Sequence, residues 1–139
     1  MHIFFITYDS GHKMSFDRMF KRCIASLFPF VSMEQTHKVQ VYTTTATKVR
    51  QLVLQALDAH TGLAQQVEII DATAMVKIHW PYGTSTYPRV GHLRVVLIPH
   101  LLNSRDTQSV TYLDCDTEMK DVNAMLQLQF ARDPAFRFY

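Results

Sequence analysis

The feature that most constrains the fold is an alternation of short apolar runs with segments of helical period. The apolar run HIFFITY, at residues 2–8, is typical of a strand buried on both faces, and further strands are predicted at 38–43 and 66–71. Each of the two intervening segments carries one apolar face at helical spacing. The order strand, helix, strand, helix, strand predicts parallel strands joined by right-handed crossovers, with helices on both faces of the sheet.

Turn formers and caps delimit these two helices. Pro29 should stop the first helix, and Gly62 should end the second. Candidate N-caps of the second helix are Thr43, Thr44 and Thr45. The faces expected to be buried are Phe16, Met19, Phe20, Cys23, Ile24 and Leu27 in the first helix, and Val49, Leu52, Val53, Ala56 and Leu57 in the second.

The second half of the chain continues the α/β pattern. A loop at 80–88 precedes a helix predicted at 90–102, in which Pro99 marks a kink or the last turn. A fourth strand is predicted at 109–113, and a short helix at 121–130. The residues of the 90–102 helix expected to face inward are Val90, Leu93, Leu97 and Leu101.

Length and charge exclude several classes of protein. A chain of 139 residues, 47% of them hydrophobic, is the size of one domain with a buried core. The net charge of +2 comes without a basic block, so the sequence has no nucleic-acid footprint. No apolar run approaches the ~20 residues that span a bilayer, and the N-terminus lacks the pattern of a secretion signal. Two cysteines are too few for a disulfide framework or a zinc site, and Cys23 is expected in the core.

Two aspartates, Asp114 and Asp116, follow the fourth predicted strand in the sequence VTYLDCDTEMK. Alternate residues of a strand project to the same side, so both carboxylates should face the crevice at the carboxyl ends of the strands, with Cys115 pointing away. Carboxylate oxygens that leave coordination positions for phosphate suit Mg²⁺ or Mn²⁺ on a nucleotide diphosphate. The alternative is strand-end polarity, with Asp116 capping the next turn, and the residues alone favour neither.

Other acidic residues allow further hypotheses. A phosphatase of the haloacid dehalogenase type would use Asp114 as a nucleophile, but its Asp-x-Asp normally lies on the first strand of the domain, and only residues 117–139 follow here. Asp71, at the end of the third strand, either contacts a ribose or caps the next turn.

Two blocks of the sequence resemble family 8 glycosyltransferases. The block HLRVVLIPHLLNSRDTQSVTYLDCDTEMKDVNAMLQLQF, at 92–130, is similar to the family's helix with a Pro-x-Leu-Leu-like end followed by Tyr-Leu-Asp-x-Asp. The block FITYDSGHKMSFDRMFKRCIASLF, at 5–28, is similar to the family's first strand and helix. Within the family, the chain most resembles the xyloside α-1,3-xylosyltransferase branch.

The resemblance implies a GT-A fold, a UDP-sugar donor, a Mn²⁺ (or Mg²⁺) ion, and retaining transfer of the sugar to a glycan or glycoprotein acceptor, with xylose as the sugar in the branch named. It implies that Asp116 is the main metal ligand and that Asp114 contacts the metal or the ribose. Thr7 and Tyr8 would contact uracil, partly through the backbone. Arg94 would reach the donor phosphates, and its alternative is an exposed helix charge.

The sequence also departs from the family pattern. Family members continue past the equivalent of residue 139 with a His-x-x-Gly-x-x-Lys-Pro-Trp-like motif that supplies a third metal ligand. Residues 1–139 therefore resemble a single nucleotide-sugar-binding domain, the donor half of a longer enzyme whose relatives are anchored in the ER or Golgi lumen. The seven histidines fit no such motif and are expected at the surface or in loops. The catalytic residues stay unassigned.

Two functional hypotheses follow from these observations. One is a glycosyltransferase of which this chain is the donor-binding part. The other is a nucleotide-sugar-binding remnant without activity of its own. In either case three phenylalanines near the end, Phe130, Phe136 and Phe138, would form an apolar patch, which predicts self-association or a partner that covers it.

Overall fold

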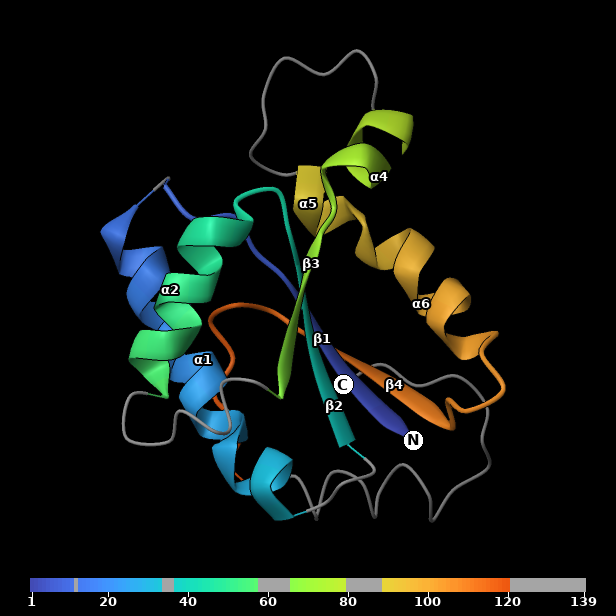
Figure 1. Ribbon diagram of the computed structural model, residues 1–139, viewed down its shortest axis with the longest axis horizontal. Helices are drawn as coiled ribbons and strands as arrows, with labels where there is room; N and C mark the ends of the chain where they lie inside the picture. Colours follow the sequence, from blue (N-terminus) through green and yellow to red (C-terminus); the bar gives the residue numbers. More distant parts are fainter. Residues whose placement is uncertain (12, 34–36, 58–65, 80–88, 121–139) are drawn as a thin grey trace.

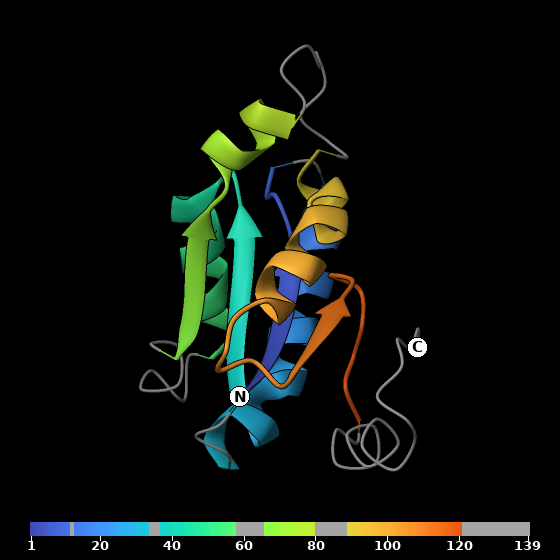
Figure 2. The ribbon, with the colours of Figure 1, turned by 90° about the vertical axis from the view of Figure 1, so that its right-hand side faces the viewer.

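The computed structural model describes residues 1–11, 13–33, 37–57, 66–79 and 89–120. Within this part of the chain, one sheet has the strand order β3-β2-β1-β4, and all its pairings are parallel. Figure 2 shows the arrowheads of β2, β3 and β4 pointing the same way. The strands are β1 (His2–Thr7), β2 (His37–Thr43), β3 (Val67–Asp71) and β4 (Ser109–Leu113). The expected Rossmann-like α/β architecture is confirmed.

Helices cover both faces of this sheet, as the alternating pattern predicts (Figure 1). One layer consists of α1 (Met14–Met33) and α2 (Ala46–Ala56), and the other of α4 (Thr73–His79), α5 (Arg89–His92) and α6 (Arg94–Leu102). Each layer encloses its own cluster of buried apolar side chains against the sheet. None of the helices described is long and apolar enough to cross a membrane.

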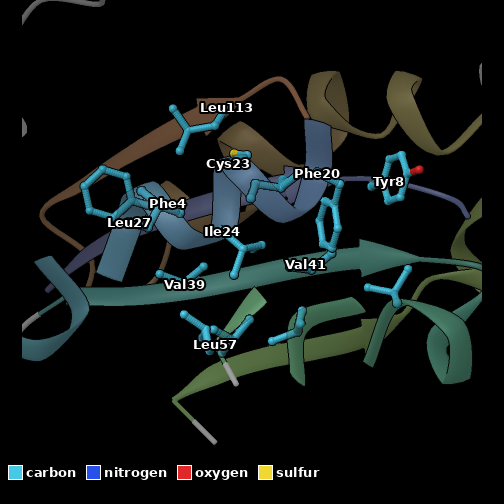
Figure 3. Close-up of a cluster of buried hydrophobic side chains, with 14 residues drawn as sticks. Phe4, Tyr8, Phe20, Cys23, Ile24, Leu27, Val39, Val41, Leu57 and Leu113 are labelled. Atoms are coloured by element: carbon cyan, nitrogen blue, oxygen red, sulfur yellow. The ribbon is translucent and has the colours of Figure 1, made fainter. Parts of the chain in front are cut away.

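The central strand β1 explains why its sequence is a continuous apolar run. Phe4 and Ile6 belong to the cluster under α1 and α2, whereas Ile3 and Phe5 belong to the cluster on the opposite face. Every residue of β1 is buried. Figure 3 shows the first cluster, in which Phe4 and Val39 of the sheet lie among α1 residues such as Leu27. Because both faces are packed, neither can accept polar residues without a partner.

The first helix follows the predicted face but not the predicted end. Phe20, Cys23, Ile24 and Leu27 are almost fully buried, which confirms the core position of Cys23. The helix nevertheless continues through Pro29 to Met33, so the predicted stop is wrong. A proline inside a helix costs about 3 kcal/mol, and a long helix whose face packs on a sheet has enough tertiary stabilisation to offset that cost.

The other helices depart from the predictions in smaller ways. The second helix begins after Thr45, whose hydroxyl makes no capping hydrogen bond, and it ends at Ala56, six residues before Gly62. The helix expected at 90–102 is divided at Leu93 into α5 and α6, and Pro99 lies in the last turn. The inward residues of this segment are buried as expected: Val90, Leu93, Leu97 and Leu101.

One helix of the structure was not predicted, and some predictions concern residues that the structure does not describe. The helix α4 was not predicted, because its seven residues are too few to show a helical period. The predicted loop at 80–88, the short helix at 121–130 and the terminal phenylalanines lie outside the described residues.

Candidate functional site

A cleft of about 480 Å³ opens at the carboxyl ends of β1 and β4. The chain leaves β1 toward β2 and β3 on one side, then returns to place β4 on the other side, so the strand order reverses between β1 and β4. Crevices at such reversal points are where open α/β sheets bind ligands. The cleft is lined by the end of β1, the first turns of α1, the α5–α6 junction and the turn after β4.

All five site residues named from the sequence line this one cleft. Thr7 and Tyr8 come from the end of β1, Arg94 from the start of α6, and Asp114 and Asp116 from the segment after β4. These residues are up to 109 positions apart in the chain, and the parallel sheet brings their segments to a common edge. The fold therefore gathers in one cleft the set of residues that the sequence suggested.

The two aspartates lie on a turn rather than on a strand. The backbone N–H of Thr117 donates to the carbonyl oxygen of Asp114 at 3.0 Å, which closes a turn immediately after Leu113. Asp114 and Asp116 are exposed, whereas Cys115 is half-buried and packs against the core cluster under α1. Both aspartates line the cleft as expected, and Cys115 packs against the core as expected but also lines the cleft; a turn rather than strand alternation produces this arrangement.

Contacts with α1 anchor this turn. The Cys23 thiol lies 3.8 Å from the carbonyl oxygen of Asp114, and the backbone N–H of Met119 donates to the Ser26 hydroxyl at 2.9 Å. Burial raises the pKa of Cys23 to about 12, with Cys115 the next cause, so the Cys23 thiol stays protonated at neutral pH. Because α1 also packs on the sheet, these two contacts tie the segment 114–119, which includes both aspartates, to the core of the protein.

Arg94, Tyr112 and Thr7 form one polar wall of the cleft. A guanidinium nitrogen of Arg94 lies 4.0 Å from a carboxylate oxygen of Asp114, and the Arg94 guanidinium lies 5.5 Å from the centre of the Tyr112 ring. The hydroxyls of Tyr112 and Thr7 are 3.2 Å apart and share a hydrogen bond. Burial raises the pKa of Tyr112. The wall thus presents one cation and two hydroxyls beside the aspartates.

The hydroxyl and the backbone N–H of Tyr8 bond to other residues of the protein, although Tyr8 lines the cleft. Its hydroxyl donates to the Asp17 carboxylate, and its ring stacks on Phe20 with centroids 4.6 Å apart. Its backbone N–H donates to the carbonyl of Tyr42 at 3.1 Å. Burial and the contact with Asp17 raise the pKa of Tyr8 far above its usual range. Contacts from Tyr8 to a ligand would therefore use its ring edge or its carbonyl oxygen.

The sequence analysis missed Asp9, which also lines the cleft. Its buried carboxylate accepts hydrogen bonds from the Thr43 hydroxyl at 2.9 Å, the Thr44 N–H at 2.6 Å and the Thr44 hydroxyl at 2.7 Å. These bonds join the ends of β1 and β2. In the sequence, an aspartate before Ser-Gly indicates only a turn, so no local pattern could have shown its role.

Ser10, which follows Asp9, is bonded both to the residue before α2 and to α1. The N–H of Ser10 donates to the Thr45 hydroxyl at 3.0 Å, and the Ser10 hydroxyl donates to Asp17 at 3.0 Å. Gly11 follows with φ of +108°, a backbone conformation that other residues rarely adopt. The chain can therefore turn sharply from β1 into α1, and the hydrogen bonds of Ser10 to Thr45 and Asp17 hold this turn.

A divalent ion bound by Asp114 and Asp116 would take most of its ligands from water or from a bound phosphate. Asp114 and Asp116 offer carboxylate oxygens to the cleft, and no group of three His, Cys, Asp or Glu residues among those described could hold a metal. Mg²⁺ is commonly held in this way, by one or two carboxylates with water and phosphate oxygens as the remaining ligands. The donor set therefore suits a hard cation that enters with a phosphorylated ligand.

Two further predicted roles are settled by local contacts. Asp71 accepts hydrogen bonds from the N–H of Thr73 at 2.9 Å and from its hydroxyl at 2.6 Å, so it caps the turn into α4. These bonds lower the pKa of Asp71. The expectation that the histidines lie at the surface or in loops is wrong for His2, which is buried in β1 with its ring nitrogens against the hydroxyls of Ser109 and Thr111.

Comparison with known proteins supports the fold. No protein-family model and no curated protein matches the sequence. Among solved structures, the chain is similar to the apo form of mouse xyloside xylosyltransferase 1, with a TM-score of 0.62 and 14% identical residues. The match covers 94% of this chain and 48% of that chain, so the protein spans about half the length of the enzyme. The fold is glycosyltransferase-like.

Proposed function

We propose that this chain binds a UDP-sugar in the cleft at the ends of β1 and β4, through a Mn²⁺ or Mg²⁺ ion held by Asp114 and Asp116. In this proposal it is the donor-binding half of a retaining glycosyltransferase of family 8. The observation that carries the proposal is the convergence of five residues, named from sequence alone, on one cleft at the reversal of strand order. The likeness to a xylosyltransferase adds support at the level of fold.

The lining residues suit the different parts of such a ligand. Asp114 and Asp116 would hold the ion, which supplies stabilisation of the negative charge on the departing diphosphate. Arg94 is within the cleft and partly exposed, so its guanidinium would donate hydrogen bonds to phosphate oxygens. The uracil would lie near Thr7 and the Tyr8 ring, where hydroxyl and apolar groups adjoin. The acceptor and the group that acts at the anomeric carbon stay unassigned.

The sugar and the acceptor form a finer part of the proposal. The resemblance of the sequence to the xyloside xylosyltransferase branch and the name of the similar structure both favour xylose as the transferred sugar. The acceptor would be a glycan or glycoprotein. Transfer from UDP-xylose, compared with UDP-glucose and UDP-galactose, measures this preference directly.

A second candidate is a nucleotide-sugar-binding protein without transferase activity. It is favoured by the donor set: of the three carboxylates that line the cleft within the described residues, Asp9 already accepts three hydrogen bonds from Thr43 and Thr44, which leaves Asp114 and Asp116 for a metal. The two candidates share the same binding site and differ in turnover. Sugar transfer by the 139-residue chain itself would exclude the second candidate.

Calorimetric titration of UDP with and without Mn²⁺ tests the shared site. We expect metal-dependent binding that is lost in Asp116→Asn and kept in Glu118→Gln. Glu118 is an exposed acid two residues away that does not line the cleft, so its variant controls for the loss of one negative charge. Equal binding by both variants, or binding that ignores Mn²⁺, would refute the proposed metal site.

An assay of phosphate-ester hydrolysis separates the proposal from the phosphatase hypothesis. A phosphatase would release inorganic phosphate from an aryl phosphate and would lose that activity in Asp114→Asn. The proposed function predicts no such release, because Asp114 serves there to hold a cation rather than to attack phosphorus.

A further inference from the structure

Arg94 and Asp114 form an ion pair inside the proposed donor cleft. Their side chains are 53% and 63% exposed, and the nitrogen–oxygen distance of 4.0 Å is long for such a pair. The guanidinium also lies over the Tyr112 ring, 5.5 Å from its centre. An exposed pair of this length is weakly held, so the guanidinium can leave Asp114 without a large loss of stability.

We propose that Arg94 is a removable counter-charge that opposes divalent-ion binding at Asp114 until a diphosphate draws the guanidinium away. This inference rests on the proposed function, because it requires that the cleft accept both a metal ion and a diphosphate. It adds a second role to Arg94, beyond contact with phosphate. Arg94 is thereby a positioning residue that links the occupancy of the metal site to the presence of the nucleotide.

The electrostatics of the wall carry this inference. A guanidinium beside Asp114 neutralises part of the negative charge that attracts a cation, and it repels a second positive charge placed at the same carboxylate. A diphosphate offers Arg94 a stronger partner, because phosphate oxygens accept paired hydrogen bonds from the planar guanidinium. Tyr112 gives the guanidinium a face to rest on in the absence of the nucleotide.

Metal and nucleotide must then bind with positive coupling. If the diphosphate removes Arg94 from Asp114, it increases the affinity for the ion, and the ion increases the affinity for the diphosphate by the same factor. Part of this coupling comes from direct contact between ion and phosphate. The part due to Arg94 is the part that disappears when its charge is removed.

The test measures the affinity for Mn²⁺ alone and with UDP, from the electron paramagnetic resonance signal of free Mn²⁺. Wild type is compared with Arg94→Met, which keeps an apolar stem against Tyr112, and with Arg50→Met. Arg50 is exposed on α2 and does not line the cleft, so its variant controls for the loss of one positive charge. We expect Arg94→Met to bind Mn²⁺ alone about two- to fivefold more tightly, the range that an exposed ion pair allows.

The same variant should also show weaker coupling. The gain in Mn²⁺ affinity caused by UDP should fall by the same factor in Arg94→Met, and Arg50→Met should behave as wild type. If wild type binds UDP with Mn²⁺ but Arg94→Met binds Mn²⁺ alone no more tightly, the inference is wrong and the proposed function stands. If wild type binds no Mn²⁺ even with UDP, both are wrong.

Discussion

The burial of His2 predicts that the protein loses stability in mild acid. The imidazole is buried in β1, and its two ring nitrogens meet the hydroxyls of Ser109 and Thr111 on β4. Burial, with the neighbouring His37 as the next cause, lowers the pKa of His2 from 6.5 to about 4. The folded chain therefore holds the ring neutral at a pH where the unfolded chain protonates it.

The sign and size of the effect follow from that difference in pKa. Between pH 6.5 and about pH 4 the unfolded state binds a proton that the folded state does not, so the free energy of unfolding falls as the pH falls. Above pH 6.5 neither state is protonated at His2, and its contribution is constant. Each tenfold difference in proton affinity is worth about 1.4 kcal/mol, so the loss across this window is about 3 kcal/mol.

Urea denaturation at several pH values between about 7.5 and about 4 measures this loss, because that range spans the pKa of His2 in the unfolded and in the folded chain. His2→Gln keeps a polar side chain in the strand but cannot titrate, so the same series on this variant isolates His2 from the other titrating groups. We expect wild type to lose about 3 kcal/mol more than His2→Gln on acidification. Parallel pH profiles for the two proteins would show that the buried imidazole is not held neutral and would refute the reasoning.

Three substitutions test other parts of the account, each by urea denaturation at neutral pH. Tyr8→Phe keeps the stack on Phe20 but removes the hydroxyl that donates to Asp17, and it should cost about 1.5–3 kcal/mol; an unchanged midpoint would mean that the bond contributes nothing. Phe20→Ala empties a fully buried site and should cost about 3–5 kcal/mol, whereas a cost below about 1 kcal/mol would contradict the described packing. Pro99→Ala restores an exposed helical N–H in α6 and should stabilise the protein by about 1 kcal/mol or more; destabilisation would show that the proline is needed there.

The sequence predicted the sheet well because each strand carries its own signal. The strand at 109–113 was predicted with the bounds that β4 has, since an apolar run there ends at two aspartates. Long helices were also visible from their period, whereas α4 is too short to show one. The end of α1 was misplaced because Pro29 is a local signal, and packing of the helix on the sheet offsets its cost.

The candidate site was predictable where its residues follow strands and unpredictable where contacts define them. Asp114 and Asp116 could be assigned to the cleft because parallel strands end at one edge. The role of Asp9 depends on the hydroxyls and N–H of a turn 34 and 35 residues away, and no local pattern reveals such a contact. The pairing of Arg94 with Asp114 depends likewise on the meeting of α6 and β4 in space.

The most direct test of the central claim is a nuclear magnetic resonance titration of isotopically labelled protein with Mn²⁺ in the presence of UDP. Paramagnetic Mn²⁺ broadens the amide signals nearest to it, and Mg²⁺ serves as the diamagnetic control. The account predicts that broadening begins at residues 7–9, 91–94 and 114–117, which surround the cleft, while signals of α2 and β3 stay sharp. Broadening that centres on another part of the molecule, or that needs no UDP and spreads evenly, would contradict the claim that this cleft is a metal-dependent nucleotide site.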